Sequence, residues 1–468
     1  MTRPDGVNRP PLLPGPDALR TLVGQLLSER EEAGADVGGL AAALESAGGS
    51  YDALLTVATE LGERPIRADF PYTEPEELAG ITASWSAESL SPRPPGPDAT
   101  DRIRTAFLAR VAGCVLGKPF EFDPTGEELR AVLEPAGEWP LSDYVTEATN
   151  ARLRSPQPQS PECVRERLAW VCEDDDINYT VLAMLLLERQ GPDFTPADLQ
   201  LLWLRQLPLA ATFGPERTHL IGSGLDALLG GTDEAPAGAR SPGRLLHPGM
   251  ELCGALIRAD AYGYAYPGDP ARAATLAYRD ARCTHRGSGV YGAMFVAAAI
   301  AAALVTDATE TGNPARLDPL RTGLAVVPPH SRLAETVRHS LDLVAAAADW
   351  WSAYQDVHTA YGRFGHCRIY QEVGTLAVTL RFAEDVGHGL GLQVCQGNDT
   401  DSFGATAGSL LGALLGPTRF DPRWLAPFRD EIHLALAMFH ERSLSALAAR
   451  VAALPGVVAG RQFGPHPS

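Results

Sequence analysis

The sequence is short of positive charge, and nearly all the positive charge that it has is arginine. Its 468 residues include 58 acidic and 39 basic side chains, which gives a formal net charge of −19, and Lys118 is the only lysine. The phosphates of nucleic acids and the headgroups of anionic lipids need a basic surface to bind. We therefore expect neither nucleic acid nor a membrane surface as a partner. The scarcity of lysine is a bias of composition and by itself indicates no function.

The chain also lacks the cysteine spacing of a zinc site and the long apolar runs of a membrane protein. Its seven cysteines form no C-x-x-C pair, so neither a zinc site nor a disulfide framework is indicated. The apolar run 290–305 is too short to span a bilayer comfortably and is typical of a buried helix. The first 17 residues contain no apolar segment of the signal-peptide kind. We expect a cytoplasmic protein.

Strand-like alternation is scarce as well, whereas helical periodicity is common. In the segment 101–117, Ile103, Phe107, Val111 and Val115 repeat every four residues and predict a core-facing helix. Helices are predicted over the ranges 18–32, 39–47, 51–61, 101–117, 162–170, 177–189, 198–207, 249–259, 270–281, 289–306, 334–349, 372–382, 402–415, 427–439 and 443–453. The predicted fold class is all-α.

The spacing of these segments divides the chain into two parts. Residues 1–17 are rich in proline and glycine, which predicts a flexible arm, and three helical segments follow it. Residues 62–100 lose helical periodicity and end in a Pro-rich linker. We therefore expect an N-terminal arm and helical extension with a Pro-rich linker over 1–100, and a compact multi-helix domain over 101–468.

Carboxylates are concentrated at two places. Four consecutive acids, Glu173 to Asp176, precede a run of good helix formers, and Asp399 and Asp401 open a second helix rich in small residues. Acidic side chains suit the positive end of a helix dipole, so either stretch alone is explained as a solvated helix start. Together with the hydroxyl of Ser402, however, the two stretches offer the oxygen ligands that hard divalent cations prefer.

At these residues the chain resembles the ADP-ribosylglycohydrolases, over about residues 101–454. In that family a Thr-Asp-Asp-Thr helix start and a later Asp-x-Asp-Thr/Ser helix start hold two Mg²⁺ ions. Glu173 and Asp176 stand where the first motif has threonines. The resemblance implies a binuclear metal site with the ligands Glu173, Asp174, Asp175, Asp399, Asp401 and Ser402. The implied cofactor is Mg²⁺, as two ions, with Mn²⁺ or Ca²⁺ as alternatives because the two additional acids change the charge of the site.

The resemblance also implies the catalytic residues. Glu121 ends the segment GKPFE, where the family has a loop carboxylate beside the substrate ribose. We therefore expect Glu121 and Asp401 to be the catalytic carboxylates, with Asp401 also a metal ligand. The family usually has a Gly-Asp pair where this chain has Gly113 and Cys114, so one acidic group of the family is replaced by a thiol.

A further segment carries the implied substrate-binding residues. His285 stands at the position of the family histidine that contacts bound ADP-ribose, although a lone histidine is by itself more often a structural hydrogen-bond donor. Gly287, Gly289 and Tyr291 follow closely in the sequence. We expect these four residues to form one edge of a substrate pocket.

The implied activity is Mg²⁺-dependent hydrolysis of the N- or O-glycosidic bond of an ADP-ribosylated protein side chain or a small ribosylated molecule. Paired divalent ions orient ribose hydroxyls and polarise water, and a carboxylate assists the oxocarbenium-like transition state. Two alternatives remain open. One is a non-catalytic ADP-ribose- or nucleotide-binding protein on the same fold. The other is a divergent metal hydrolase of another riboside, which the departures at Cys114, Glu173 and Asp176 keep open.

Overall fold

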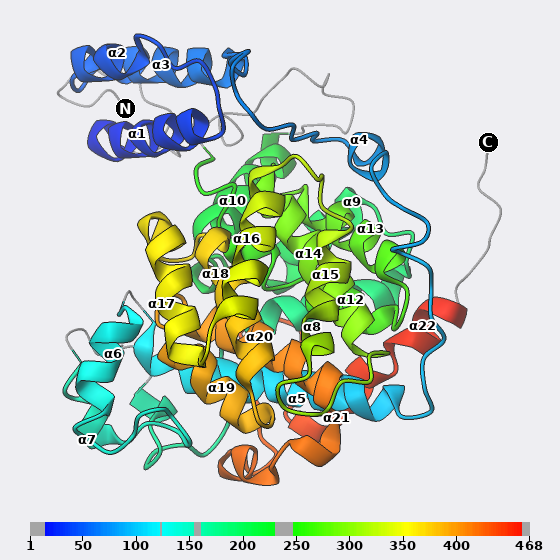
Figure 1. Ribbon diagram of the computed structural model, residues 1–468. Coiled ribbons are helices and arrows are strands. Elements are labelled where there is room, and N and C mark those ends of the chain that lie inside the picture. The colour runs from blue at the N-terminus through cyan, green and yellow to red at the C-terminus, as the bar shows by residue number, and fades with distance from the viewer. Residues whose placement is uncertain (1–14, 122–123, 154–160, 230–246, 461–468) are drawn as a thin grey trace. The chain divides into compact units, whose positions relative to one another are not determined.

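The structure is all-α, as the sequence predicts (Figure 1). This computed structural model describes residues 15–121, 124–153, 161–229 and 247–460. Within these ranges the only strand-like pairing is a set of isolated β-bridges. None of the described helices is long and apolar enough to cross a membrane.

Two compact units share the chain, and each combines separate stretches of sequence. The first comprises residues 1–72 and 212–250, and the second comprises residues 73–211 and 251–468, as far as they are described. The helices of the first unit are α1 (Pro16–Glu32), α2 (Leu40–Ala47), α3 (Tyr51–Glu63) and α10 (Gly214–Leu229). A helix from the middle of the chain therefore belongs with the N-terminal helices.

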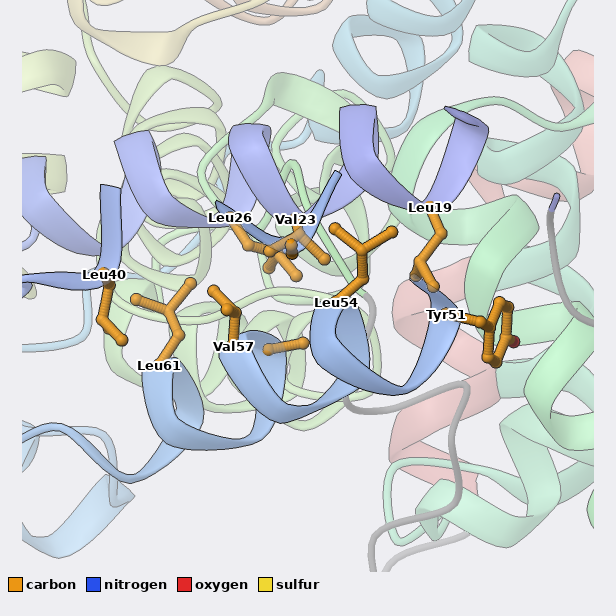
Figure 2. Packing of buried hydrophobic residues seen from close by; sticks show 10 residues of the cluster. Leu19, Val23, Leu26, Leu40, Tyr51, Leu54, Val57 and Leu61 are labelled. Carbon is orange, nitrogen blue, oxygen red and sulfur yellow. The ribbon is translucent and has the colours of Figure 1, made fainter. Parts of the chain in front are cut away.

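Apolar side chains at helical spacing hold the first unit together. On α1, Leu19, Val23 and Leu26 recur every three or four residues and point toward α3, where Leu54 and Val57 face them (Figure 2). All five side chains are buried. Burial of an apolar side chain of this size contributes roughly 1.5–3 kcal/mol, so the contact between α1 and α3 is the main source of this small core.

The second unit is a larger helical body in which some helices are buried along their whole length. One of these, α14 (Ser288–Ala303), is fully buried, which confirms the prediction from the apolar run 290–305. The other α-helices of the unit are α4 (Leu78–Thr82), α5 (Ala99–Gly117), α6 (Gly126–Leu133), α7 (Glu147–Asn150), α8 (Asp175–Gln190), α9 (Pro196–Gln206), α12 (Asp260–Ala265), α13 (Pro270–Ala281), α15 (Asp318–Leu324), α16 (Arg332–Ala346), α17 (Trp350–Tyr361), α18 (Ile369–Phe382), α19 (Val386–Cys395), α20 (Thr400–Leu415), α21 (Leu444–Ala452) and α22 (Leu454–Gly460).

Glycines bring α5 and α20 into backbone-to-backbone contact. Gly113 on α5 lies against Gly404 on α20, and a Cβ added at Gly117 would overlap the carbonyl oxygen of Thr400. Farther along the contact, Gly408 lies against the backbone of α5. The two helices are antiparallel and side by side, in cyan and orange in Figure 1. The C-terminal end of α5 therefore meets the acidic start of α20.

Three of the predicted helices are wrong, namely 162–170, 249–259 and 427–439. In the first, the backbone N–H of Arg165 donates to the carbonyl of Val145 at 2.8 Å instead of to its own turn. In the second, only the 3-10 turn η4 (Cys253–Ala255) forms, because the N–H of Cys253 donates to the carbonyl of Cys367 at 2.8 Å. Helical periodicity in both segments reflects burial of apolar residues in irregular backbone.

The third segment is extended where the prediction expected a helix. Arg429 and Asp430 both have positive φ angles, which end the preceding turn. Ile432 then pairs with Val171 in a parallel β-bridge, and the N–H of His433 donates to the carbonyl of Val171 at 2.9 Å. This bridge fixes the backbone just before the first acidic stretch.

Candidate functional site

The first acidic stretch forms the start of α8, and its four side chains have different surroundings. Asp174 caps the helix by accepting a hydrogen bond from the N–H of Asp176 at 2.9 Å. Asp174 and Asp176 are buried, Asp175 is half-buried, and Glu173 is exposed. The helix start therefore turns alternate acids into the protein, because Asp174 still has extended backbone, in which neighbouring side chains point to opposite sides and residues two apart share one side.

The second acidic stretch forms the start of α20 and is buried. Asp399, Asp401 and Ser402 are all less than a tenth exposed. The N–H of Asp399 donates to Glu372 Oε1 at 3.3 Å, and the N–H of Ser402 donates to Asp401 Oδ1 at 3.0 Å. The hydroxyl of Thr400 donates to the carbonyl of Gly117 at 2.8 Å, which attaches the helix start to the end of α5.

The two acidic stretches meet in the interior of the second unit. The hydroxyl of Ser402 on α20 donates to Asp176 Oδ2 on α8 at 3.2 Å. Lys118 joins them a second time, because its Nζ lies 2.5 Å from Asp174 Oδ2 and 3.3 Å from Asp401 Oδ2. Glu121 contacts the same ammonium at 3.1 Å. Carboxylates from two distant segments and from the loop after α5 thus share one site.

A buried arginine lies behind the acids. Arg110 on α5 approaches Asp176 Oδ1 at 3.8 Å and Asp260 Oδ2 at 3.3 Å, and its Nη2 donates to the backbone carbonyl of Asp176 at 2.7 Å. Burial disfavours the charge of Arg110, but the two carboxylates outweigh burial and raise its pKa. Arg110 therefore fixes the first turn of α8 and neutralises part of the acidic charge.

The remaining carboxylates carry more negative charge than the surrounding protein neutralises. Burial raises the pKa of Asp176, and the charges of Asp174 and Asp175 raise it further. Burial also raises the pKa of Asp401, with a further contribution from Glu121. For Lys118, burial acts to lower the pKa, but the carboxylates around it raise the pKa well above its usual value. The raised pKa values favour protonation of Asp176 and Asp401, so a cation that binds these carboxylates would compete with protons.

Oxygen atoms without a hydrogen-bond donor show that the residues fit a divalent cation. Among the described residues, Asp176 Oδ1 and Glu372 Oε2 are buried and accept no hydrogen bond. Lone pairs of this kind are costly unless a cation binds them, and carboxylate oxygens are the ligands that Mg²⁺ and Mn²⁺ prefer. Sulfur is present as well, since Cys253 Sγ lies 2.9 Å from Cys367 Sγ and 3.1 Å from Asp399 Oδ2.

Sequence reasoning missed several residues of this site. Arg110 and Glu372 are far from the acidic stretches in the sequence, and no motif marks them. Lys118 lies in the segment GKPFE, where the resemblance points only to the carboxylate of Glu121. Cys253 and Cys367 are 114 residues apart, so C-x-x-C spacing could not find them. The one available signal was the spacing of glycines at every fourth position in both α5 and α20, which is typical of close helix contacts.

The residues expected to bind substrate belong to a second hydrogen-bond network. His285 is buried and shares a hydrogen bond between its Nδ1 and Thr284 Oγ1 at 2.7 Å, and Thr284 in turn accepts from Arg258 at 2.6 Å. Gly289 lies in the first turn of α14. Tyr291 donates its hydroxyl hydrogen to the carbonyl of Pro75 at 2.6 Å. Three of the four residues are therefore placed on or next to the start of α14.

Gly287 connects this network to the acidic site through α18. It precedes α14 with a φ of +50°, and a Cβ there would lie 3.1 Å from Glu251 Oε1. Glu251 accepts a hydrogen bond from the hydroxyl of Tyr370 at 3.0 Å. Tyr370 lies two residues before Glu372 on α18, and Glu372 binds the backbone of Asp399. The start of α14 and the acidic site are thus braced by the same helix.

Comparison with known proteins identifies one family. The sequence model of the ADP-ribosylglycohydrolases matches residues 95–456, which include both acidic stretches. A solved structure described as an ADP-ribosylglycohydrolase-related protein complex aligns over 77% of this chain and 99% of that chain, with 21% sequence identity and a TM-score of 0.46. No curated protein matches the sequence.

Proposed function

The chain belongs to the ADP-ribosylglycohydrolase family and is therefore a hydrolase of glycosidic bonds; from this premise we propose that it is a divalent-metal-dependent enzyme. Its substrate would be the N- or O-glycosidic bond of an ADP-ribosylated side chain or of a small ribosylated molecule. The observation that carries this proposal is the meeting of two buried acidic helix starts, linked by the contact of Ser402 with Asp176 at 3.2 Å.

The proposed metal ligands follow from the donors at the two helix starts. Asp174 and Asp175 would supply oxygens from α8, and Asp399, Asp401 and Ser402 would supply them from α20. Glu173, which is exposed, is proposed at the outer edge of the set. Bound Mg²⁺, or Mn²⁺ in its place, would supply Lewis acidity and orient ribose hydroxyls.

The chain's own residues have separable tasks in the proposed reaction. Glu121 lies on the segment after the 3-10 turn η1 (Lys118–Phe120) and is half-buried, so its carboxylate is available to hold or move a proton at the scissile bond. Asp401 is held in the first turn of a rigid helix and orients the cation-binding face. His285, Gly287, Gly289 and Tyr291 are proposed to line the ADP-ribose side of the pocket.

Variants of the two carboxylates test this assignment. We expect Asp401→Ala to lower kcat/KM by about 100-fold or more, because it removes a metal ligand, and to weaken Mn²⁺ binding. We expect Glu121→Gln to lower kcat by about 100-fold through loss of a proton-transfer group, with Mn²⁺ affinity unchanged. Asp101→Asn removes an exposed acid of α5 and serves as the matched control, with full activity. Full activity in Asp401→Ala would refute the assignment.

A substrate panel separates this proposal from its alternatives. ADP-ribosyl-arginine, ADP-ribosyl-serine and simple nucleosides would be incubated with the protein in Mg²⁺ and in a chelator. Turnover of an ADP-ribosyl compound only in Mg²⁺ supports the proposal. Tight binding of ADP-ribose without turnover of any compound would make the chain a binding protein, and turnover of simple nucleosides alone would assign it to another riboside.

A further inference from the structure

Lys118 is held rigidly at the point where α5 meets α20. It follows Gly117, whose carbonyl accepts the hydroxyl hydrogen of Thr400 at 2.8 Å and whose Cα has no room for a side chain. A cation at the C-terminal end of a helix is favoured by the helix dipole. The side chain of Lys118 is only 12% exposed. Its position is therefore set by the glycine contact between the two helices.

The ammonium of Lys118 has its full set of acceptors. Asp174 Oδ2 lies at 2.5 Å, Glu121 Oε2 at 3.1 Å and Asp401 Oδ2 at 3.3 Å. An ammonium group has three hydrogens to donate, and these carboxylates come from three separate segments of chain. A divalent ion that joined α8 to α20 through Asp174 and Asp401 would need the same two Oδ2 atoms. The ammonium thus lies where one such ion would bind.

We propose that the ammonium of Lys118 replaces one of the two cations of the acidic site, so that each chain binds a single divalent ion. This inference deepens the proposed function. It rests on that function for the other cation position, the one that would still hold a divalent ion. That position lies on the side of Asp399, Asp176 and Ser402, where Glu372 Oε2 and Asp176 Oδ1 accept no hydrogen bond. One ion there, together with Lys118, balances the acids with less charge than two divalent ions would bring.

The stoichiometry of Mn²⁺ binding tests this inference without any measurement of activity. Equilibrium dialysis at saturating Mn²⁺, with metal and protein quantified, should give one ion per chain for the unmodified protein. Lys118→Met should give two, because Asp174, Glu121 and Asp401 then lack their cation. The matched control is Arg104→Met, which removes an exposed positive charge from α5, the helix that precedes Lys118, and this variant should still bind one ion.

Two ions per unmodified chain would overturn the inference and leave the metal-dependent function standing. One ion in a folded Lys118→Met variant would also overturn it. An unmodified chain that binds no ion would overturn the inference together with the proposed metal dependence. One ion per chain without hydrolysis of any riboside would support the inference while the proposed activity fails.

Amine chemistry gives a second test that needs no variant. Lys118 is the only lysine, so an amine-selective acylating reagent has only Lys118 and the terminal amine to modify. If the ammonium keeps its place, Lys118 should stay protected in Mn²⁺ as it is in a chelator, measured by mass spectrometry of the digested protein. Faster labelling of Lys118 in Mn²⁺ would mean that the metal displaces the ammonium, which would overturn the inference.

Discussion

Within the four acids 173–176, the position of each residue relative to the helix start decides its role. Glu173 precedes the cap and is exposed, whereas Asp176 lies in the first turn of α8 and is buried. A buried carboxylate is tolerated only with compensating partners, and Asp176 has Arg110 at 3.8 Å and the hydroxyl of Ser402 at 3.2 Å. Glu173 and Asp176, which stand where the family has threonines, therefore differ: Glu173 is an exposed acid, whereas Asp176 is a buried acid held by Arg110 and Ser402.

Paired substitutions at these two positions should show the difference. We expect Asp176→Ala to lower the free energy of unfolding by about 3 kcal/mol, because removing one partner of a buried ion pair leaves Arg110 with less compensation. Glu173→Thr should change stability by less than about 0.5 kcal/mol, as exposed substitutions usually do. Urea unfolding followed by circular dichroism measures both. Equal losses of stability would contradict the distinction.

At the scale of elements, the glycine contact between α5 and α20 determines where the site forms. Gly408 lies against the backbone carbonyl of Ala109, and Gly412 lies against Ala106. Side chains at these positions would separate the helices, and the separation would carry Lys118 away from Asp401. The geometry of the site therefore depends on residues that contact no ligand.

A glycine substitution in the middle of this contact should be destabilising although alanine is the better helix former. We expect Gly408→Ala to cost about 1–3 kcal/mol through overpacking, measured by urea unfolding. The control is Gly224→Ala on α10, where an added Cβ meets nothing within 4 Å. That change should stabilise the protein by about 0.5–1 kcal/mol, because glycine is a poor helix former. A stabilising Gly408→Ala would contradict the close contact.

Periodicity predicted elements well where a buried helix face alternates with an exposed one, as in α13, α16 and α21. It failed at 249–259 because an external carbonyl, that of Cys367, takes the backbone N–H of Cys253. The acidic stretches were recognisable because each motif is local in sequence. The contact of Lys118 with Asp401 spans 283 residues, and no pattern in one sequence reports such a pairing.

At the scale of the whole molecule, the acidic site belongs entirely to one of the two compact units. The sequence predicted a boundary near residue 100 from loss of periodicity, and no pattern marks α10 as part of the first unit. All seven tryptophans lie in the second unit, at Trp85, Trp139, Trp170, Trp203, Trp350, Trp351 and Trp424. Tryptophan fluorescence therefore reports unfolding of the unit that carries the site.

Binding of a divalent ion should raise the stability of this unit selectively. A ligand that binds only the folded state stabilises it by RT ln(1 + [L]/Kd), about 2.7 kcal/mol at 100 times Kd. We therefore expect Mn²⁺ to raise the Tm from tryptophan fluorescence, and a chelator to reverse the shift. Asp401→Ala should lose most of the shift, whereas Asp101→Asn should keep it.

Far-ultraviolet circular dichroism also reports the helices α1–α3 of the first unit. Any part of its unfolding transition that comes from the first unit should therefore not respond to Mn²⁺. A Tm from fluorescence that is the same in Mn²⁺ and chelator would contradict metal binding at the acidic site.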